Sequence, residues 1–276
     1  MKPFLKWVGG KTQIIDKIME YVPREIANYH DLFLGGGSTL FAILESDRVI
    51  TGKIYAYDIN EPLIWCYKNI QKLPGDVHVY MSLYANKYKN SNSKKEYYLS
   101  VREKYRSLED KTTPEASAIF MFLNKTCFKG MYRESKKSGF NVPFGDYKKP
   151  KFLSKDEINN MSVFIKDVNF ICCDFKETTN YIEPGDYVYA DPPYYPEKKE
   201  SFVNYTNKDF SLEKHEELFN ELEDLNEKGV KFTLSNSNTE YVKDIFQFYN
   251  IEEITARRSI HYKDPSLIAS EIIISN

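Results

Sequence analysis

The sequence predicts an α/β protein built on one open sheet that is interrupted once by a basic insertion. Short apolar runs alternate with stretches of helical period towards both ends of the chain, which is typical of the strands and helices of such a sheet. Between them, from Lys72 to about Asn160, the composition turns polar and rich in lysine. A chain of 276 residues suits one large α/β domain with a smaller insertion. We therefore expect a core domain of residues 1–71 and 161–276 and an insertion of residues 72–160.

The N-terminal part predicts a strand, a glycine-rich loop, a helix and a second strand. The expected elements are a helix over Lys11–Tyr21 ended by Pro23, a strand over His30–Leu34, a helix over Thr39–Glu45 and a strand over Lys53–Tyr57. Gly35 and Gly37 follow the first strand and would let the backbone approach a ligand, and Asp58 follows the second strand, where it could bind ribose hydroxyls. Tight-turn glycines and a helix-capping aspartate are the structural alternatives. The order of the elements favours a nucleotide-type ligand site in a parallel sheet.

The insertion and the C-terminal part predict a second set of elements. In the insertion we expect helices near Lys94–Arg106 and Pro114–Leu123, and then a loop or hairpin over Gly130–Lys151. After it we expect strands over Val168–Cys172 and Tyr187–Ala190, a helix over Leu212–Lys228 closed by Gly229, and strands over Val230–Leu234, Ile251–Thr255 and Ala269–Ile274.

The composition and the cysteine spacing indicate which classes of protein the chain does not belong to. The four cysteines, at positions 66, 127, 172 and 173, form no Cys-x-x-Cys pair and have no histidine at ligand spacing, so neither a metal site nor a disulfide framework is expected. Met1–Gly10 lacks the apolar core of a secretory signal, and no run reaches about 18 apolar residues, so we expect neither secretion nor membrane spanning. These features predict a cytoplasmic protein, or one of the host-cell cytoplasm if the source is viral. The aromatic fraction of 15% suits stacking on planar ligands, or reflects a bias in composition.

Two segments carry a local excess of basic residues although the net charge is −2. Asn124–Lys151 holds eight bases against two acids, and Lys87–Arg106 holds seven against two. Such runs are usually solvated faces, and contact with phosphate is the functional alternative.

The tetrapeptide Asp191-Pro192-Pro193-Tyr194 follows the expected strand Tyr187–Ala190. Two prolines after a strand end its hydrogen-bonded ladder, so the motif could be only a turn. A carboxylate, a rigid backbone and an aromatic ring within four residues could also hold a planar amino group for chemistry.

Seven motifs in one order connect these features to a known family. They are Lys6–Lys11, Phe33–Gly37, Asp58–Asn60, Asn124–Arg133, Phe140–Gly145, Asp191–Tyr194 and Arg257–Ile260. With them the chain resembles the D12 class of DNA adenine N6-methyltransferases, and Asn141–Lys149 is most similar to the Dam and DpnII-type members that act on GATC. The resemblance implies a Rossmann-like sheet that binds S-adenosylmethionine, a helical and hairpin insertion that recognises duplex DNA, and a possible cognate restriction endonuclease acting on the same site.

The resemblance also implies roles for individual residues. Asp191 and the carbonyl of Pro192 would accept the two N–H bonds of an adenine amino group, and Tyr194 would stack on a base that has left the helix. The expected cofactor residues are Trp7, Lys11, Phe33, Gly35, Gly37, Asp58, Asp174, Phe175 and Asp191. The expected DNA residues are Lys6, Arg133 and Asn141 for base recognition and Lys125, Lys148, Lys149, Arg257 and Arg258 for phosphates. Phe202, Tyr205 and Thr206 would form a lid over the base. Core packing is an alternative for Trp7, and phosphate contact is one for Lys6 and Arg133.

The chain departs from the family at two places. Relatives carry Asn at the position of Lys129, and they have a basic, glycine-containing run where His261–Ile268 holds only Lys263. These departures bear on the recognised site more than on adenine methylation. The alternatives are methylation of RNA or of a protein amide nitrogen, a DNA-binding protein without turnover, and a small-molecule dehydrogenase. The last leaves the Lys6–Lys11 and Asn141–Gly145 motifs unexplained.

Overall fold

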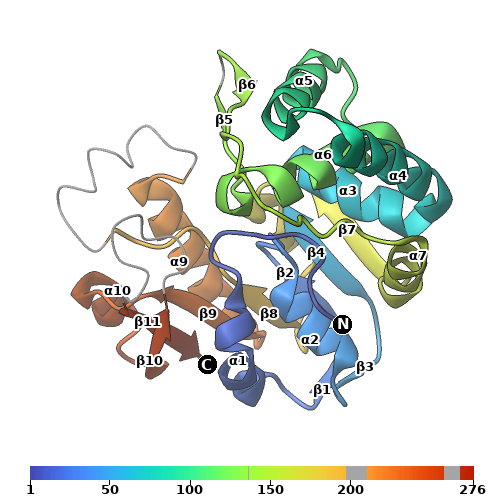
Figure 1. Ribbon diagram of the computed structural model, residues 1–276. Helices are drawn as coiled ribbons and strands as arrows, with labels where there is room; N and C mark the ends of the chain where they lie inside the picture. Colours follow the sequence, from blue (N-terminus) through green and yellow to red (C-terminus); the bar gives the residue numbers. More distant parts are fainter. Residues whose placement is uncertain (136, 197–209, 258–267) are drawn as a thin grey trace. The chain divides into compact units, whose positions relative to one another are not determined.

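The computed structural model describes residues 1–135, 137–196, 210–257 and 268–276 (Figure 1). Residue contacts divide the chain into two compact units. The first unit comprises Met1–Gly10, Gly35–Ser38 and Asn60–Cys172, and the second comprises Lys11–Leu34, Thr39–Ile59 and Cys173–Asn276. Among the helices of these ranges, none has the length and apolar character needed to cross a bilayer. The division expected at residues 72 and 160 stays a prediction.

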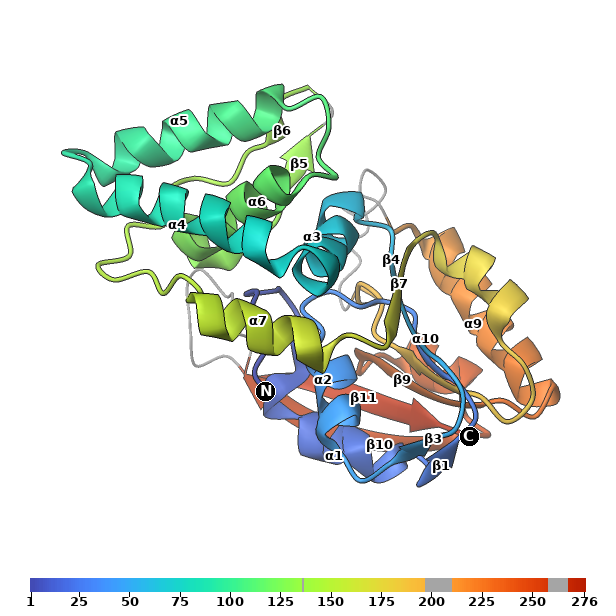
Figure 2. The same ribbon diagram turned by 90° about the vertical axis from the view of Figure 1, so that its right-hand side faces the viewer.

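The second unit is built around six strands in the order β10-β11-β9-β8-β2-β4. The elements of this unit are the 3-10 helices η1 (Lys11–Gln13) and η3 (Phe175–Tyr181), the helices α1 (Ile15–Tyr21), α2 (Ser38–Glu45), α9 (Leu212–Glu227) and α10 (Glu240–Ile245), and the strands β1 (Glu25–Ile26), β2 (Tyr29–Asp31), β3 (Val49–Ile50), β4 (Ile54–Asp58), β8 (Tyr187–Ala190), β9 (Lys231–Ser237), β10 (Asn250–Arg257) and β11 (Ile268–Ser275). In Figures 1 and 2, α1 and α2 lie on one side of this sheet and α9 lies on the other. The α/β class predicted from the sequence is confirmed.

The sheet is mixed rather than parallel throughout, which corrects the expectation. Strands β4, β2, β8 and β9 run parallel, whereas β11 pairs antiparallel with both β9 and β10. Parallel neighbours need a crossover connection, whereas antiparallel neighbours can follow each other directly in sequence, as β10 and β11 do. The expected strand over His30–Leu34 is shorter, because the chain leaves the ladder after Asp31 to enter the glycine loop, although the amide of Leu32 still donates to the carbonyl of Tyr189.

The order of the strands brings several carboxyl ends to one edge. Strands β4, β2 and β8 are parallel neighbours in register, with Ala56 opposite Asp31 and Asp31 opposite Tyr189. Strand β8 is buried along its whole length. Polar side chains that end or follow these strands therefore gather at the same edge of the sheet, which is where ligands bind in open α/β sheets.

The first unit is mainly helical and carries a short hairpin. Its elements are α3 (Glu61–Lys72), α4 (Pro74–Asn90), α5 (Lys94–Ser107), α6 (Pro114–Thr126), the 3-10 helix η2 (Phe128–Gly130), β5 (Glu134–Ser135), β6 (Gly139–Phe140), α7 (Lys155–Phe164) and β7 (Val168–Cys172). Helix α6 forms the core of this unit, because it is buried along nearly its whole length and packs against α3, α4 and α5. Thr113 caps its first turn and Pro114 occupies the first position, as helix starts favour.

The expected helices at Lys94–Arg106 and Pro114–Leu123 are confirmed, and the run over Gly130–Lys151 contains the β5–β6 hairpin. Helices α3, α4 and α7 were not predicted. The buried face of α4 includes Tyr84 and Tyr88 besides Val77 and Met81, so the apolar period is weaker than in an aliphatic helix.

Candidate functional site

The tetrapeptide begins where β8 ends. Asp191 follows Ala190, and its Oδ1 lies 2.7 Å from Nζ of Lys11 on η1. The side chain of Lys11 is only 5% exposed and that of Asp191 18%, so water screens this ion pair little. Pro192 is buried behind it. Of the predicted residues, the structure therefore brings Lys11 and Asp191 into direct contact.

Burial dominates the electrostatics of Asp191. It raises the pKa of this carboxyl group to about 6, Lys11 opposes the rise, and the carboxylate of Glu271 adds to it. Burial also raises the pKa of Asp31 to about 8, with further increases from Asp191 and Asp58. Oδ1 of Asp31 has no hydrogen-bond partner within the described ranges. Three carboxyl groups that end neighbouring parallel strands thus influence one another at one edge of the sheet.

The ring of Tyr194 lies between groups of opposite charge. Its hydroxyl donates a hydrogen bond to Oε2 of Glu271 on β11 at 2.8 Å. Nζ of Lys11 lies 4.9 Å from the ring centroid, within the range of a cation–π contact. Burial and the carboxylates of Asp191 and Glu271 raise the pKa of Tyr194 far above its usual value, so the hydroxyl stays protonated.

The backbone after the tetrapeptide is held by two side chains of β9. The amide of Tyr195 donates to Oδ1 of Asn236 at 3.0 Å, and its carbonyl accepts from the hydroxyl of Ser237 at 2.7 Å. Oδ1 of Asn236 also accepts from the amide of Ser237 at 2.8 Å. Both backbone polar groups of the residue that follows Tyr194 are therefore bound to the sheet.

Aromatic rings surround Phe33, one of the predicted cofactor residues. Its ring centroid lies 5.9 Å from that of Phe175 and 5.8 Å from that of Phe210, and these two rings also contact each other. Asp174 caps η3 and forms an ion pair with Lys214 at 2.7 Å. Phe33 and Phe175 are thus brought together, and the Asp174 carboxylate already binds the amides of Lys176 and Glu177 and the ammonium of Lys214.

Three predicted cofactor residues belong to the first unit. Trp7 packs against the glycine loop, where a Cβ atom added to Gly35 would lie 2.7 Å from the indole ring. Gly35 and Gly37 have φ angles of 47° and 74°, which disfavour any other residue. The indole also stacks on Tyr132 with ring centroids 5.8 Å apart. Trp7 therefore has a packing role, which is the alternative expected from the sequence.

Two lysines assigned to DNA by the resemblance lie near each other. The backbone of Lys6 exchanges hydrogen bonds with the buried side chain of Asn124, and Nζ of Lys6 lies 3.9 Å from the ring centroid of Tyr147. Gly130 lets this segment approach, because a Cβ atom there would lie 2.4 Å from that of Lys6. Burial, together with the charge of Lys6, lowers the pKa of Lys125 to about 8. Lys125 is thus partly shielded from solvent.

Arg133 and Asn141 meet across the base of the β5–β6 hairpin. Nε of Arg133 donates to Oδ1 of Asn141 at 2.6 Å, and the amide of Asn141 donates to the carbonyl of Arg133 at 3.0 Å. The guanidinium group of Arg133 is exposed and oriented by this contact. Two residues predicted to recognise bases are therefore brought together.

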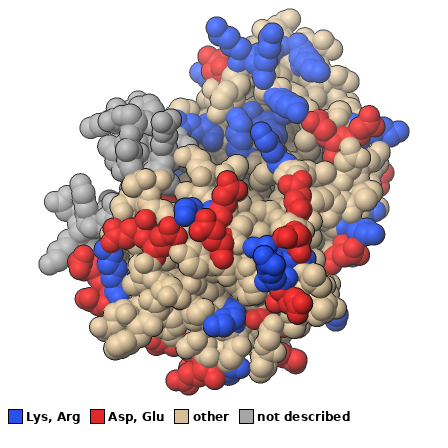
Figure 3. Space-filling view, turned by 90° about the horizontal axis from the view of Figure 1, so that it is seen from below, with Lys and Arg blue, Asp and Glu red and all other residues tan. Residues whose placement is uncertain are grey.

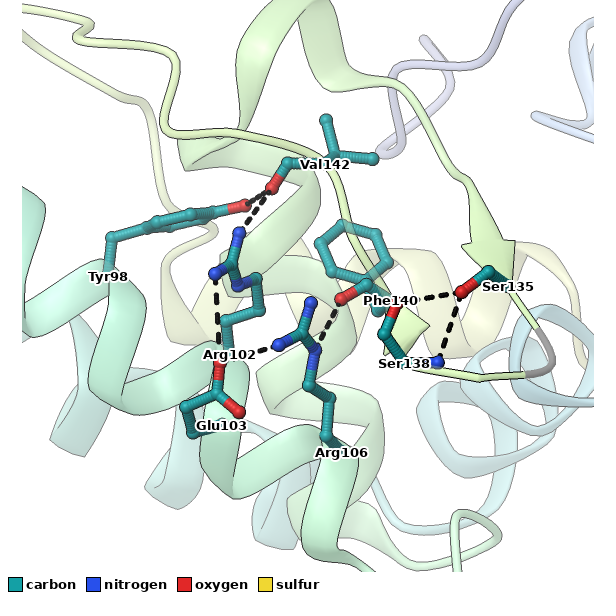
Figure 4. A network of polar contacts seen from close by, with 8 residues as sticks. All are labelled: Tyr98, Arg102, Glu103, Arg106, Ser135, Ser138, Phe140 and Val142. Atoms are coloured by element: carbon teal, nitrogen blue, oxygen red, sulfur yellow. Dashed lines mark hydrogen bonds and ion pairs between the residues drawn. The ribbon is translucent and has the colours of Figure 1, made fainter.

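Helix α5 binds the second strand of the hairpin and the residues after it, as Figure 4 shows. Nε of Arg106 donates to the carbonyl of Phe140 at 2.7 Å, while Tyr98 and Arg102 both donate to the carbonyl of Val142. Glu103 forms ion pairs with both arginines. The backbone on either side of Asn141 is thus attached to a helix.

The remaining residues predicted to bind DNA are either exposed or only partly described by the structure. Lys148 and Lys149 are exposed. On the face drawn in Figure 3, Lys and Arg side chains gather most densely towards the top of the view, so charge is unevenly distributed despite the small net charge. Arg257 ends β10, and its side chain is not described. Arg258, Phe202, Tyr205 and Thr206 lie outside the described residues.

Lys129 has a φ angle of 53°, in the left-handed region that Asn adopts more readily than Lys. This conformation suits the Asn that the resemblance implies for this position better than it suits Lys.

Comparison with known proteins assigns the chain to a protein family. A model of the D12 class N6 adenine-specific DNA methyltransferases matches residues 7–260. The chain belongs to this family. Its Type II relative M.MjaIII of Methanocaldococcus jannaschii is 37% identical over 273 residues, which cover 95% of this chain and 94% of that protein. The Type II methyltransferase M1.LlaDCHI of Lactococcus lactis subsp. cremoris is 33% identical, over 100% of this chain and 95% of that protein. A DNA adenine methylase of Vibrio cholerae is 30% identical, over 94% and 90%.

The family assignment confirms the resemblance stated from the motifs and makes the chain an adenine-specific DNA methyltransferase. Two carboxyl groups at its candidate site, Asp31 and Glu271, are not among the residues predicted from the sequence. The only signal for each is an acid directly before an apolar run, 32–34 for Asp31 and 272–274 for Glu271.

Proposed function

We propose that this methyltransferase transfers a methyl group from S-adenosylmethionine to N6 of an adenine that has left the helix, within GATC in duplex DNA. The observation that carries the proposal is the carboxylate of Asp191, held by Lys11 at the end of β8 beside the ring of Tyr194. Such a group accepts hydrogen bonds from an amine, and the ring offers a stacking surface.

The chemistry needs alignment and charge stabilisation more than a strong base. The lone pair of adenine N6 is delocalised into the ring, so accepting its two N–H bonds at Asp191 and the Pro192 carbonyl favours the pyramidal nitrogen that reacts and stabilises its developing positive charge. A buried site strengthens this effect. The aromatic ring of Tyr194 offsets part of the few kcal/mol that extrusion of the base costs, because stacking on an aromatic ring is worth about 1–3 kcal/mol.

The second unit fits a cationic nucleoside cofactor. The carboxyl groups of Asp31, Asp58 and Asp191 end or follow parallel neighbouring strands, and Oδ1 of Asp31, which has no hydrogen-bond partner within the described ranges, is suited to a polar group of the ligand. The rings of Phe33 and Phe175 suit a planar base. When bound, S-adenosylmethionine supplies a methyl group on a sulfonium that leaves readily. The expected contributions of Trp7, Gly35, Gly37 and Asp174 are carried over from the family motifs.

The proposed GATC specificity rests on Arg133 and Asn141. Arginine bound in bidentate fashion to O6 and N7 of guanine is the commonest specific contact in the major groove. Because Nε and Nη2 of Arg133 donate to the side chain and the carbonyl of Asn141, at 2.6 and 3.4 Å, the guanidinium is held in an oriented plane at the exposed base of the hairpin. Lys6, Lys125, Lys148, Lys149, Arg257 and Arg258 are proposed as contacts that add affinity. A restriction endonuclease that cuts the same sequence is a possible partner within this proposal.

Transfer of labelled methyl groups from S-adenosylmethionine tests the function. The wild type should label a GATC duplex and not the same duplex carrying GTTC, and Asp191→Ala should abolish labelling. Asp244→Ala removes an exposed carboxylate of the same unit and should leave labelling intact. Absence of label with wild-type protein would refute the function, whereas equal labelling of both duplexes would refute only the site. RNA and a protein substrate in parallel reactions test the alternatives.

A further inference from the structure

The carboxylate of Glu271 lies at the candidate site, and the sequence predicted no role for it. It lies on β11 opposite Ser237 of β9 in the antiparallel register. Directly opposite residues of antiparallel strands present their side chains on the same face. Glu271 binds the hydroxyl of Tyr194, and Ser237 binds the backbone carbonyl of Tyr195. Glu271 and Ser237, which lie opposite each other in the sheet, thus bind the consecutive residues Tyr194 and Tyr195 of the loop after β8.

The contacts of Tyr194 leave its ring little freedom. Its hydroxyl is bound to Glu271, Nζ of Lys11 lies near the ring, and Tyr195 is bound through both backbone polar groups. Rotation about χ1 would carry the hydroxyl away from Glu271 and break this hydrogen bond, whereas rotation about χ2 leaves the oxygen, which lies on the rotation axis, in place. The hydrogen bond therefore fixes the position and the long axis of the ring, and the contact with Lys11 adds to its restraint.

We propose that Glu271 is a positioning residue for methyl transfer, because its hydrogen bond to the Tyr194 hydroxyl fixes the position of the ring on which the target adenine stacks. This inference rests on the proposed function, in which Tyr194 meets the base. Glu271 acts through Tyr194 and does not itself contact the substrate. Its charge has a second effect, which is to hold the Asp191 carboxyl group protonated to higher pH.

The charged and titratable groups around Asp191 come from four elements of the sheet and its edge. They are Lys11 from η1, Asp31 from β2, Tyr189 and Tyr194 from β8 and the loop after it, and Glu271 from β11. Of these, Lys11 lowers the pKa of Asp191 and Glu271 raises it. Replacing Glu271 by a neutral residue should therefore move the acid limb of the activity profile to lower pH.

Three variants separate the hydrogen bond from the charge. Glu271→Ala removes both, Glu271→Gln keeps an acceptor without charge, and Tyr194→Phe keeps the ring without its hydroxyl. Glu271→Ala and Tyr194→Phe should each lower the single-turnover rate roughly tenfold, as loss of one hydrogen bond to a charged group does. The double variant should lose no more than either single variant. Glu271→Gln should lose less than Glu271→Ala and show the acid limb at lower pH.

A second readout follows the target base directly. The fluorescence of 2-aminopurine in place of the target adenine rises when the base leaves the stack, and the rise should be smaller with Glu271→Ala than with wild type. The matched control is the Tyr21–Glu252 pair, a hydrogen bond of 2.6 Å in the same unit away from the tetrapeptide. Tyr21→Phe and Glu252→Ala should change neither readout, and circular dichroism confirms folding of every variant.

The outcomes distinguish the two proposals. Normal transfer and base extrusion by Glu271→Ala, or additive losses in the double variant, would overturn the role of Glu271 while leaving the function intact. Failure of the wild type both to label DNA and to change the 2-aminopurine signal would overturn the proposed function itself.

Discussion

The Lys11–Asp191 pair makes a strong prediction about stability. The rise in the pKa of Asp191 from 3.8 to about 6 corresponds to about 3 kcal/mol against its charged form, at about 1.4 kcal/mol per pKa unit. This cost remains although Lys11 opposes it. Since the folded protein keeps this proton to higher pH than the unfolded chain does, the contribution of Asp191 to the free energy of unfolding should fall as the pH rises from about 4 to about 6 and stay level above.

Replacement of either partner should change the free energy of unfolding by an amount that depends on the charge of the other. Asp191→Asn keeps this side chain uncharged, as protonation does, and should raise the free energy of unfolding at pH 7.5 by up to about 3 kcal/mol, which is the cost of the charged form. Lys11→Met should raise the pKa of Asp191 above 6 and destabilise the protein at pH 7.5, because the carboxylate loses its counter-charge. The double variant should be more stable than Lys11→Met, and by more than Asp191→Asn gains over the wild type, because Lys11 no longer offsets the cost of the carboxylate.

Urea denaturation at pH 7.5 measures this cycle through the midpoint and the slope of each transition. The exposed pair Lys176–Glu217 of the same unit is the control, and Lys176→Met with Glu217→Gln should shift stability by less than about 0.5 kcal/mol. Additive effects of the two substitutions in the Lys11→Met, Asp191→Asn double variant would show that the two charges do not depend on each other and would refute the reasoning.

Three further predictions follow from the site and the hairpin. The kcat/KM of the wild type should rise with pH around a midpoint near 6, because Asp191 must be ionised to accept the amine; a flat profile from pH 5 to 8 would contradict this. Arg106→Ala should lower transfer at GATC roughly tenfold, because Phe140 loses its donor, whereas the exposed control Lys95→Ala should not, and equal rates would argue against the attachment of the hairpin. Lys129→Asn should raise the free energy of unfolding by up to about 1 kcal/mol in urea titrations, and a loss would show that the left-handed φ carries no strain.

The sequence predicted those elements whose signals are local. The bounds of β7 and β8 agree with the prediction, and α9 begins after its cap at Ser211 and ends before Gly229, as the pattern indicated. The tetrapeptide Asp191–Tyr194 and the glycine loop were found because their residues are adjacent in sequence. Elements with tyrosine on their buried face, such as α4, gave a weaker period and were not predicted.

Contacts between distant segments could not be predicted in the same way. Glu271 meets Tyr194 only because β11 inserts between β9 and β10, and Asn236 reaches Tyr195 only because β9 lies beside β8. The order of the strands in the sheet cannot be predicted from the spacing of residues in the sequence. The pairing of Arg133 with Asn141 likewise depends on the hairpin register, which brings Glu134 opposite Phe140.

The insertion of β11 between two earlier strands has a consequence for folding kinetics. Within the described sheet, β10 pairs only with β11, so β10 has no sheet neighbour until β11 docks against β9. Docking of this antiparallel pair is therefore a single step that both closes the sheet and delivers Glu271 to Tyr194. Partial opening of the pair would expose β9 as an unpaired edge and separate Glu271 from the ring before the parallel strands melt. Heat should accordingly inactivate the enzyme below the temperature at which its helices unfold.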